Sequence, residues 1–482
     1  MAAVLVPVLY LLFVNHYAIN SLYGDDWSVA PLVHAALHGH LSLSQLWGQY
    51  NESRLFFGNI IEVLFGVVDR FDVRAVVLFN AALFIASYAL LMALFRRYAA
   101  RRLTPIPVLL IGVIWFSLAD VQNSLWAFQV SWYLTVFWFM VMLFALLMPA
   151  SRRALWLTLA VLAAVAASLT TLQGFILWPL GLLCIFWTQP SGRRVFLEAA
   201  GWLGTMIVTI SLYLPGYRSS NNGCFPSAHC SPQVALHHPL RAVEFFFALI
   251  GNVIPGGFPS PTGNTARFEA VGAALFTVAL FVLVQSWRHR ASGEHMPLPL
   301  LLISFSLIFD VFITLGRSVA GPSGALVNNR YVMANLILFT GIVIYMWPHI
   351  RLARSHSTKS SPRVSAHFLL LGASVVFLLF QATVATEFGL TNGRTSSEIR
   401  NENAQVLVNQ GGMPAQFRTC ELYVALFAQA GASSLRIREA TADKLAEFRP
   451  SSYRYFRKLG PPAPFPACSK YRQPVRRHPK TT

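Results

Sequence analysis

Eleven runs of mostly apolar residues divide the first 385 positions, and each is a candidate for a helix that crosses a bilayer, which takes about 20 such residues. No water inside a bilayer can satisfy backbone polar groups, so runs of this kind form helices, in which those groups bond internally. No ten-residue segments of alternating polarity occur, which excludes a membrane β-barrel. The sequence therefore predicts an all-α, polytopic transmembrane helical bundle of about 11 spans. The spans are placed at 2–20, 74–95, 104–118, 126–148, 154–171, 174–188, 195–214, 267–286, 298–315, 331–347 and 366–385.

The composition agrees with these runs. Hydrophobic residues make up 55% of the chain and charged residues 12%, whereas soluble domains carry roughly 25% charged residues. A soluble domain of this size would not hide so much apolar surface, so lipid is the expected surrounding. One boundary stays open, because 154–171 and 174–188 can also be one long, broken helix.

The short loops predict the orientation of the bundle. Lys and Arg gather in loops that fall on one side by alternation, while the opposite loops 119–125 and 172–173 have none. Basic loops stay in the cytoplasm, so we expect a multi-pass protein of the cell inner (plasma) membrane with a cytoplasmic N-terminus and an extracytoplasmic C-terminus. The basic loops are 96–102, 151–153, 192–194, 288–290 and 348–365.

This orientation divides the chain into two predicted units. Residues 1–385 form the transmembrane domain, with a first outside loop at 21–73 and a second long outside loop at 215–266. Residues 386–482 form a small extracytoplasmic tail. The net charge of +18 follows largely from topology and from the tail, and no basic groove with interleaved aromatic residues indicates nucleic-acid binding.

Four cysteines lie on the predicted outside. Cys224 and Cys230 share one loop, and Cys420 and Cys468 share the tail. In an oxidising compartment each pair is a candidate disulfide. Free thiols are the alternative, and no CxxC spacing indicates structural zinc.

Two adjacent carboxylates, Asp25 and Asp26, follow the first span in the string YGDDW. Acidic residues are scarce, 19 among 482, so a pair at a membrane surface calls for an explanation. A partly desolvated carboxylate gains the basicity that proton removal requires. The tight aromatic flanks favour a shaped pocket wall, and we expect one of the two to be catalytic. A solvated helix cap is the alternative.

Two further polar strings are candidate positions for orienting a substrate. In QYNESRLFFGN, Glu52 and Arg54 suit an ion pair at the floor of a site, although surface pairs of this kind contribute little. In DVQNSLWAFQVSW, amides and an indole on one helix face suit a sugar, because amides hydrogen-bond hydroxyls and an indole stacks on a pyranose; Trp as an interfacial anchor is the alternative. The candidates of this second string are Gln122, Asn123, Trp126 and Gln129.

A Gly- and Pro-rich outside loop is flanked by Arg317 and Arg330, each at a helix end. Paired guanidiniums suit a phosphate, because each can make a bidentate contact. We group Tyr331, the next residue, with them as candidate donor-phosphate contacts. The alternative is that both arginines reach toward lipid headgroups.

Three histidines follow the acidic pair. His34, His38 and His40 can present ligands together with the aspartates, since positions i and i+4 share a helix face. Surface histidines are more often unliganded. No metal site is therefore predicted, and a divalent cation is left open as a cofactor.

Together these strings resemble the GT-C superfamily of membrane glycosyltransferases, which use polyprenyl-phosphate sugars. GDDW resembles the acidic motif of that superfamily's first outside loop. LWGQYNESRLFFGNII resembles an Asn-Glu-His-Arg stretch of bacterial members, with Ser53 where His is usual. QNSLWAFQVSW and GRSVAGPSGALVNNRY resemble recurring elements of the same group. The resemblance covers most of residues 1–385 and does not extend to the tail.

The resemblance implies a transfer reaction on the outer side of the membrane. A sugar moves from a polyprenyl-phosphate donor to an extracytoplasmic glycan or lipid acceptor. Asp25 or Asp26 takes the proton of the acceptor hydroxyl, and Arg317 and Arg330 offset the charge of the leaving phosphate. Two other functions stay open at this point. One is a transporter or flippase of lipid-linked saccharide, and the other is a non-catalytic membrane assembly protein.

Overall fold

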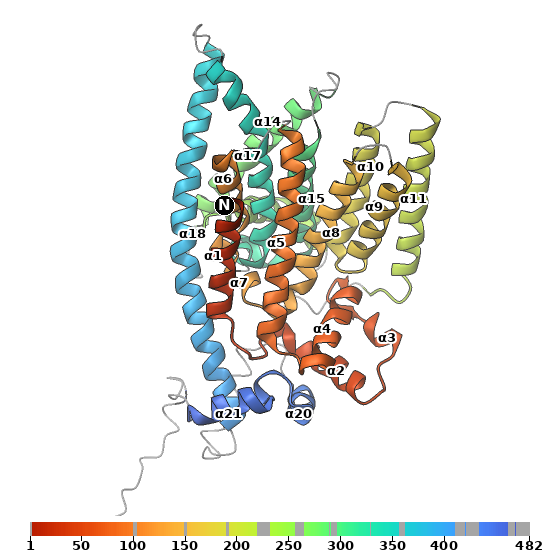
Figure 1. Cartoon of the computed structure of the whole chain (residues 1–482), viewed down its shortest axis with the longest axis vertical. Coiled ribbons are helices and arrows are strands. Elements are labelled where there is room, and N and C mark those ends of the chain that lie inside the picture. Colours follow the sequence, from red (N-terminus) through yellow and green to blue (C-terminus); the bar gives the residue numbers. More distant parts are fainter. Residues whose placement is uncertain are drawn as a thin grey trace, which may run out of the picture.

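The computed structural model describes most of the chain (Figure 1). For residues 348–375 within the helices it fixes the backbone alone. The described residues are 2–99, 104–148, 152–188, 192–218, 232–255, 265–288, 290, 296–327, 329–355, 362–409, 420, 433–460 and 468.

The described part is helical, apart from one antiparallel hairpin of β1 (Gln49–Tyr50) and β2 (Ser53–Arg54). The all-α prediction is therefore confirmed. The longer helices are α1 (Ala2–Tyr17), α4 (Phe56–Asp69), α5 (Val73–Tyr98), α6 (Pro105–Trp115), α8 (Val130–Leu146), α9 (Arg153–Ser168), α10 (Leu177–Thr188), α11 (Arg193–Tyr213), α13 (Pro239–Gly251), α14 (Ala266–Arg288), α15 (Leu298–Arg317), α17 (Val332–Ser355) and α18 (Pro362–Asn409). The short α-helices are α2 (Ala30–Leu37), α3 (Leu43–Leu46), α7 (Val121–Ser124), α12 (Pro232–His237), α16 (Gly321–Val327), α20 (Ser434–Ala442) and α21 (Pro450–Lys458). The 3₁₀ turns are η1 (Gly24–Ser28), η2 (Leu118–Asp120), η3 (Ala127–Gln129), η5 (Leu172–Ile176), η7 (Ser318–Ala320), η8 (Asn329–Tyr331) and η10 (Ala446–Phe448).

The described part holds six helical segments long and apolar enough to cross a membrane, which makes the chain a helical, multi-pass membrane protein. Four shorter apolar helices add to them: Val4–Tyr17, Arg153–Ser168, Leu172–Thr188 and Val332–Trp347. Each of these ten segments overlies one of the predicted runs, and the last predicted run, 366–385, lies within α18. The count of eleven spans remains a prediction, because only six of the ten reach full length. The six are Val73–Tyr98, Pro105–Ser124, Ala127–Leu146, Arg193–Tyr213, Ala266–Arg288 and Leu298–Val327.

The pair of runs around Thr170–Gly174 forms two helices, not one broken helix. α9 and α10 pack side by side, and η5 makes the turn between them (Figure 1). Gly174 allows this turn because its α-carbon lies against the Ala167 backbone, where an added Cβ would come within 2.0 Å of the carbonyl oxygen.

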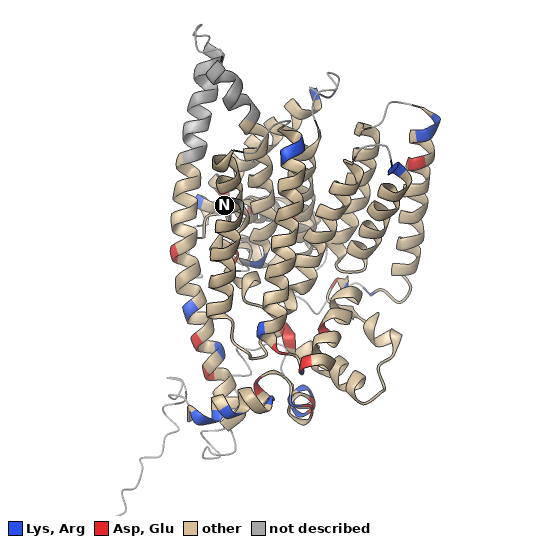
Figure 2. Cartoon of the chain, in the orientation of Figure 1, with Lys and Arg blue, Asp and Glu red and all other residues tan. Residues whose placement is uncertain are grey.

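The two ends of the bundle differ in what they carry. The C-terminal end of α5 and the start of α11 lie at the upper end, where basic residues colour the helices (Figure 2). The first loop with α2, α3 and α4 lies at the lower end, next to α20 and α21 (Figure 1). The acidic loop and the tail thus share one end, opposite two of the basic segments.

The tail is continuous with the membrane domain, and the predicted boundary at 385/386 falls inside α18. No proline follows Pro362 in this helix, so its backbone hydrogen bonds continue without a break into the polar residues after 385. Gly389 and Gly393 let α18 pack tightly against Leu118 and Phe13. A Cβ added to Gly389 would stand 2.3 Å from Leu118 Cβ, and one added to Gly393 would stand 3.1 Å from Phe13 Cζ. Beyond residue 385 the tail is therefore anchored to the bundle by one unbroken helix.

A glycine contact in the crossing of α13 and α14 makes a first prediction. A Cβ on Gly272 would stand 1.8 Å from the Phe247 carbonyl oxygen, and a Cβ on Gly251 would stand 1.9 Å from that of Phe268. Both neighbours are helix backbone and cannot turn aside. We expect Gly272→Ala to cost about 3 kcal/mol, the upper end of ordinary overpacking.

Thermal unfolding of the purified protein in detergent checks this loss. Gly201→Ala in α11 is the matched control, because nothing lies within 4 Å of its Cβ position. The control should match or slightly exceed the wild type, since Ala is the better helix former. Equal stability of the two variants would contradict the close crossing.

Candidate active site

A cavity of about 360 Å³ opens where the loop that carries Asp25 and the β1–β2 hairpin meets the start of α8 and the end of α15. Its walls come from the loop around the β1–β2 hairpin, from η3 and η5, and from the residues at either end of the loop between α15 and α17. Several residues singled out in the sequence line it: Asp25, Glu52, Gln129, Arg317, Arg330 and Tyr331. Segments more than 300 positions apart thus contribute to one site.

The Asp25 carboxylate faces this cavity. Its Oδ1 accepts a 2.6 Å hydrogen bond from the Tyr50 hydroxyl, and a guanidinium nitrogen of Arg330 lies 3.8 Å from its Oδ2. The hairpin holds Tyr50 in place through its pairing with Ser53. Burial and the adjacent Asp25 charge raise the pKa of the Tyr50 phenol above its ordinary value, so the phenol remains a donor to Asp25.

Asp26, the other carboxylate of the pair, is fully buried and does not line the cavity. Its Oδ2 accepts from the Tyr23 backbone N–H at 3.0 Å, and its Oδ1 accepts from that of Phe128 at 2.8 Å. Burial raises its pKa to about 7, against the opposing charge of Arg400. Asp26 therefore joins η1 to η3, and Asp25 is the carboxylate of the pair that lines the cavity.

Glu52 and Arg54 do not form the predicted ion pair. Glu52 Oε2 pairs with Arg317 at 2.8 Å, across the cavity wall. Arg54 points away and donates to the carbonyl oxygens of Tyr213, Trp47 and Pro215 at 2.8, 2.9 and 2.6 Å. Ser53 and Arg54 are neighbours on β2, and adjacent side chains of a strand point to opposite faces, so Arg54 turns away from the cavity that Ser53 lines. Glu52 lies in the turn before β2, where this alternation does not apply.

Gln129 is the most telling polar residue of the cavity. Its side chain is fully buried and lines the cavity. Neither its Oε1 nor its Nε2 has a hydrogen-bond partner within the described part of the chain. A buried amide without partners costs about 1–3 kcal/mol, so it is suited to a ligand or water that enters the cavity.

The other three candidates of the string DVQNSLWAFQVSW form hydrogen bonds to the backbone of residues that line or precede the cavity wall. Gln122 Oε1 accepts from the Arg330 backbone N–H at 3.2 Å, and Asn123 donates to the Arg330 carbonyl oxygen at 2.7 Å. Trp126 donates to the Tyr23 carbonyl oxygen at 3.0 Å. None of the three lines the cavity, so Gln129 alone among the four candidates of DVQNSLWAFQVSW does.

The reason is a break in the helix that the spacing assumed. α7 ends at Ser124, Trp126 is extended with φ −118° and ψ 120°, and α8 begins only at Val130. The Trp126 ring instead packs on Gly24, whose φ is +56°. A Cβ on Gly24 would stand 2.7 Å from that ring, so the glycine before the acidic pair serves both the turn and the packing.

Sequence reasoning missed several cavity residues and the groups behind them. Tyr50 and Trp132 belong to the two quoted strings without having been selected, and Tyr217 lies at the start of the predicted loop 215–266, where nothing marked it. Thr171 and Gln173 lie in a short loop that drew attention only for its lack of charge. Their polarity beside two predicted spans was the available signal.

The tail contributes buried charges behind the acidic pair. Arg400 of α18 lies 4.4 Å from the centre of the Tyr23 ring and donates to the Leu125 carbonyl oxygen. Glu447 Oε2 accepts from the Leu22 backbone N–H at 2.9 Å. A third buried acid, Glu62 of α4, has its pKa raised well above the ordinary value by burial and then by Asp26 and Asp25.

These raised pKa values predict that stability falls as pH rises. Burial raises the pKa of Glu447 from 4.5 to about 8 and that of Asp26 from 3.8 to about 7. The folded state therefore holds protons that the unfolded state has released, and their stabilising effect is lost as pH rises toward the folded pKa values. The expected loss is about 1 kcal/mol per pH unit for each group, between pH 5 and 7.

Thermal unfolding in detergent across this pH range measures the effect. Glu447→Gln removes one titrating group and should flatten the pH dependence, whereas Glu402→Gln, a change of the same kind on a carboxyl that is only partly buried, should retain most of it. Stability that rises with pH over this range would contradict the assignment.

The histidines do not face the cavity with Asp25. His34 and His38 approach Asp443 of the tail, and His40 is outside this group. Helix α2 turns their side chains toward α20, which packs against it, and away from the cavity.

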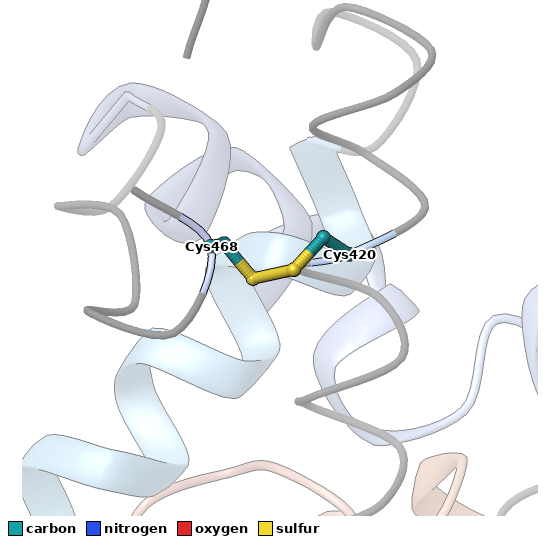
Figure 3. The surroundings of a disulfide bond; sticks show 2 residues. All are labelled: Cys420 and Cys468. Carbon is teal, nitrogen blue, oxygen red and sulfur yellow. A yellow bond between two sulfur atoms is a disulfide. The ribbon is translucent and has the colours of Figure 1, made fainter. Parts of the chain in front are cut away.

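Of the two candidate disulfides, the structure contains the one within the tail. Cys420 and Cys468 are joined, with their Cα atoms 5.8 Å apart (Figure 3). Cys224 and Cys230 lie outside the described residues.

No family model, curated protein or solved structure matches this chain. The site therefore has to be interpreted from its own chemistry.

Proposed function

We propose that this protein is a membrane glycosyltransferase of GT-C type that moves a sugar from a polyprenyl-phosphate donor to an extracytoplasmic glycan or lipid acceptor. The observation that carries the proposal is one cavity lined by the Asp25 carboxylate and by two guanidinium groups, that of Arg330 at 3.8 Å from Asp25 and that of Arg317. A base and a cationic phosphate site on one cavity are what such a transfer needs. The eleven-span topology and the outward-facing cavity belong to the same proposal.

In the proposed reaction, Asp25 Oδ2 takes the proton of the acceptor hydroxyl. The hydroxyl oxygen bonds to the anomeric carbon, and the bond from that carbon to the phosphate oxygen breaks. Its electron pair leaves with polyprenyl phosphate, whose added negative charge falls beside Arg317 and Arg330. The proton stays on Asp25 until water removes it. Holding donor and acceptor in line contributes as much as the charges.

Asp25 suits the role of base better than Glu52. Glu52 Oε2 is held in a 2.8 Å ion pair with Arg317. Asp25 Oδ1 accepts from Tyr50, whereas Oδ2 has, among the described residues, only the long 3.8 Å contact with Arg330. Tyr50 fixes the orientation of the carboxylate, and the second oxygen keeps lone pairs for a substrate proton.

The cavity also suits a sugar between the two charged groups. Gln129 offers an amide with both ends unpartnered in the described structure, and Trp132, Phe128 and Tyr331 supply aromatic surface. Amides bind hydroxyl groups, and aromatic faces pack against sugar rings. The apolar Phe312 and Leu315, near the end of α15, line the side from which a lipid chain would enter.

The two other functions fit less well. A transporter would carry its polar groups near the middle of the membrane, on broken helices, whereas the charged cavity lies at the loop end of the described bundle. An assembly protein would have no use for a buried Gln129 that lines a cavity and whose amide has no partner among the described residues.

The experiment is a transfer assay with the purified chain in detergent. A set of polyprenyl-phosphate sugars, each with a different radiolabelled sugar, is mixed with cell-envelope extract as the acceptor. Release of polyprenyl phosphate and labelling of an acceptor would support the proposal. Movement of the intact lipid-linked sugar across vesicles, with no transfer, would favour the transporter, and neither activity would favour the assembly protein.

A further inference from the structure

Two histidines and one carboxylate meet on the outer face, away from the cavity. His34 lies on α2, and His38 follows the last residue of α2 as its C-cap, one turn further along the chain. Asp443 follows the last residue of α20 and caps its C-terminus. His34 Nδ1 lies 2.7 Å from Asp443 Oδ2, and His38 Nε2 lies 3.0 Å from Asp443 Oδ1. The three ligand atoms lie within 4.8 Å of one another.

We propose that His34, His38 and Asp443 bind one divalent transition-metal ion, of which Zn²⁺ is the best match. Two imidazole nitrogens and one carboxylate oxygen are ligands that Zn²⁺ takes in proteins. Asp443 is nearly buried, with 6% of its side chain exposed, while His34 and His38 are 36% and 51% exposed. Solvent therefore reaches the site, and water completes a four-coordinate ion with three protein ligands.

The two distances from the imidazoles to Asp443 are close to those that an ion requires, and the two imidazole nitrogens lie within 4.8 Å of each other. With bonds of about 2.0–2.1 Å, tetrahedral ligands stand about 3.3 Å apart, a few tenths of an ångström more than the present hydrogen bonds. The two imidazoles are partly exposed and can make this adjustment, whereas Asp443 is fixed by its helix. Without an ion, the Asp443 carboxylate only forms hydrogen bonds to both imidazole rings. The test below distinguishes this hydrogen-bonded arrangement from a metal site.

The ion would fasten the tail to the loop that carries the acidic pair. α2 follows η1 after a single residue, and α20 packs against both. Two neighbouring contacts join the same surfaces: the Ala446 N–H donates to the Arg70 carbonyl oxygen at 3.0 Å, and Arg449 pairs with Asp72 at 3.1 Å. None of the three ligands lines the cavity, so the ion's role is structural, and the proposal stands apart from any transfer reaction.

Metal titration of the full chain tests the site. The chain is purified in detergent with a histidine-free tag, stripped with EDTA and titrated with Zn²⁺ by calorimetry, and with Co²⁺ by visible absorption. We expect one tight ion per chain, a tetrahedral Co²⁺ spectrum and a higher melting temperature with Zn²⁺. Asp443→Asn should weaken binding more than about tenfold, the least that loss of a supporting group costs.

His40→Ala is the matched control, because His40 belongs to the same loop but not to the cluster. It should leave the tight site unchanged, which separates that site from weak binding by the other histidines among the 13 in the chain. Equal Zn²⁺ affinity of the wild type and Asp443→Asn, or no tight site in either, would reduce the cluster to the hydrogen-bonded arrangement. Should Asp443→Asn fail to fold, His38→Ala decides in its place, since that imidazole is half exposed.

Discussion

Replacing Asp25 with Asn is expected to lower the rate of sugar transfer at least about a hundredfold, because general-base catalysis contributes about 10²–10⁴. The amide keeps the shape of the carboxylate and can still accept from Tyr50 at 2.6 Å, so the hairpin and the cavity should persist. What it loses is the ability to take a proton from the acceptor. The expected result is a fall in kcat with a nearly unchanged KM for the donor, measured by release of polyprenyl phosphate.

Asp26→Asn is the matched control, because the same change falls on the adjacent residue. Both carboxylate oxygens of Asp26 accept backbone N–H groups, from Tyr23 and Phe128, and an amide can accept only one of them. We expect a loss of about 1–3 kcal/mol in stability, with the rate per folded molecule within about tenfold of the wild type. A hundredfold loss of kcat in Asp26→Asn, with Asp25→Asn active, would reverse the assignment of the base.

The helical membrane architecture was predictable because its signal is local. Twenty apolar residues in a row satisfy their own backbone groups, whatever the rest of the chain does. The runs at 74–95 and 267–286 therefore reappear as α5 and α14 with shifts of a few residues. The predicted tail boundary at 385/386 is not marked by a helix end, for the complementary reason. Polarity after residue 385 marks where lipid ends, and it does not end a helix that remains packed on Leu118.

The sequence indicated the charged residues that line the site, but it did not indicate which of them pair with one another. Charge in an apolar setting marked Asp25, Glu52, Arg317 and Arg330, and all four line one cavity. Their partners depend on contacts across 265 positions, such as that of Glu52 with Arg317, which no local spacing encodes.

The role of the two aspartates was undecidable from sequence for the same reason. The 3₁₀ turn η1 and the backbone N–H of Phe128, 102 positions from Asp26, determine that Asp26 is buried and that Asp25 lines the cavity. The support from Arg400 and Glu447 is equally remote, because both belong to a tail that carried no motif.

Replacing Arg330 with Gln is expected to lower kcat about a hundredfold or more and to raise the KM for the donor, since loss of one donor to a developing anion costs about 10²–10³. Gln122 and Asn123 hold the Arg330 backbone from both sides, so the truncated side chain should leave the wall in place. Arg330→Lys keeps the charge but loses the guanidinium fork that contacts two oxygens. Its kcat and its donor affinity should therefore lie between those of the wild type and those of Arg330→Gln. Donor binding and turnover, measured separately, check this order.

Arg394→Gln is the matched control for charge, because Arg394 lies on the tail half of α18 with 77% of its side chain exposed. It removes the same charge and should leave transfer unchanged. Wild-type turnover in Arg330→Gln would contradict a phosphate site at this guanidinium.

Arg317 is expected to behave differently from Arg330, because Glu52 lies 2.8 Å from its guanidinium. Arg317→Gln leaves the Glu52 carboxylate without this partner beside the expected phosphate, so repulsion adds to the lost attraction. The double variant Glu52→Gln with Arg317→Gln removes that repulsion and should recover part of the donor affinity. A double variant as weak as the sum of both single losses would show that the two residues act independently, and it would contradict the expected repulsion between Glu52 and the phosphate.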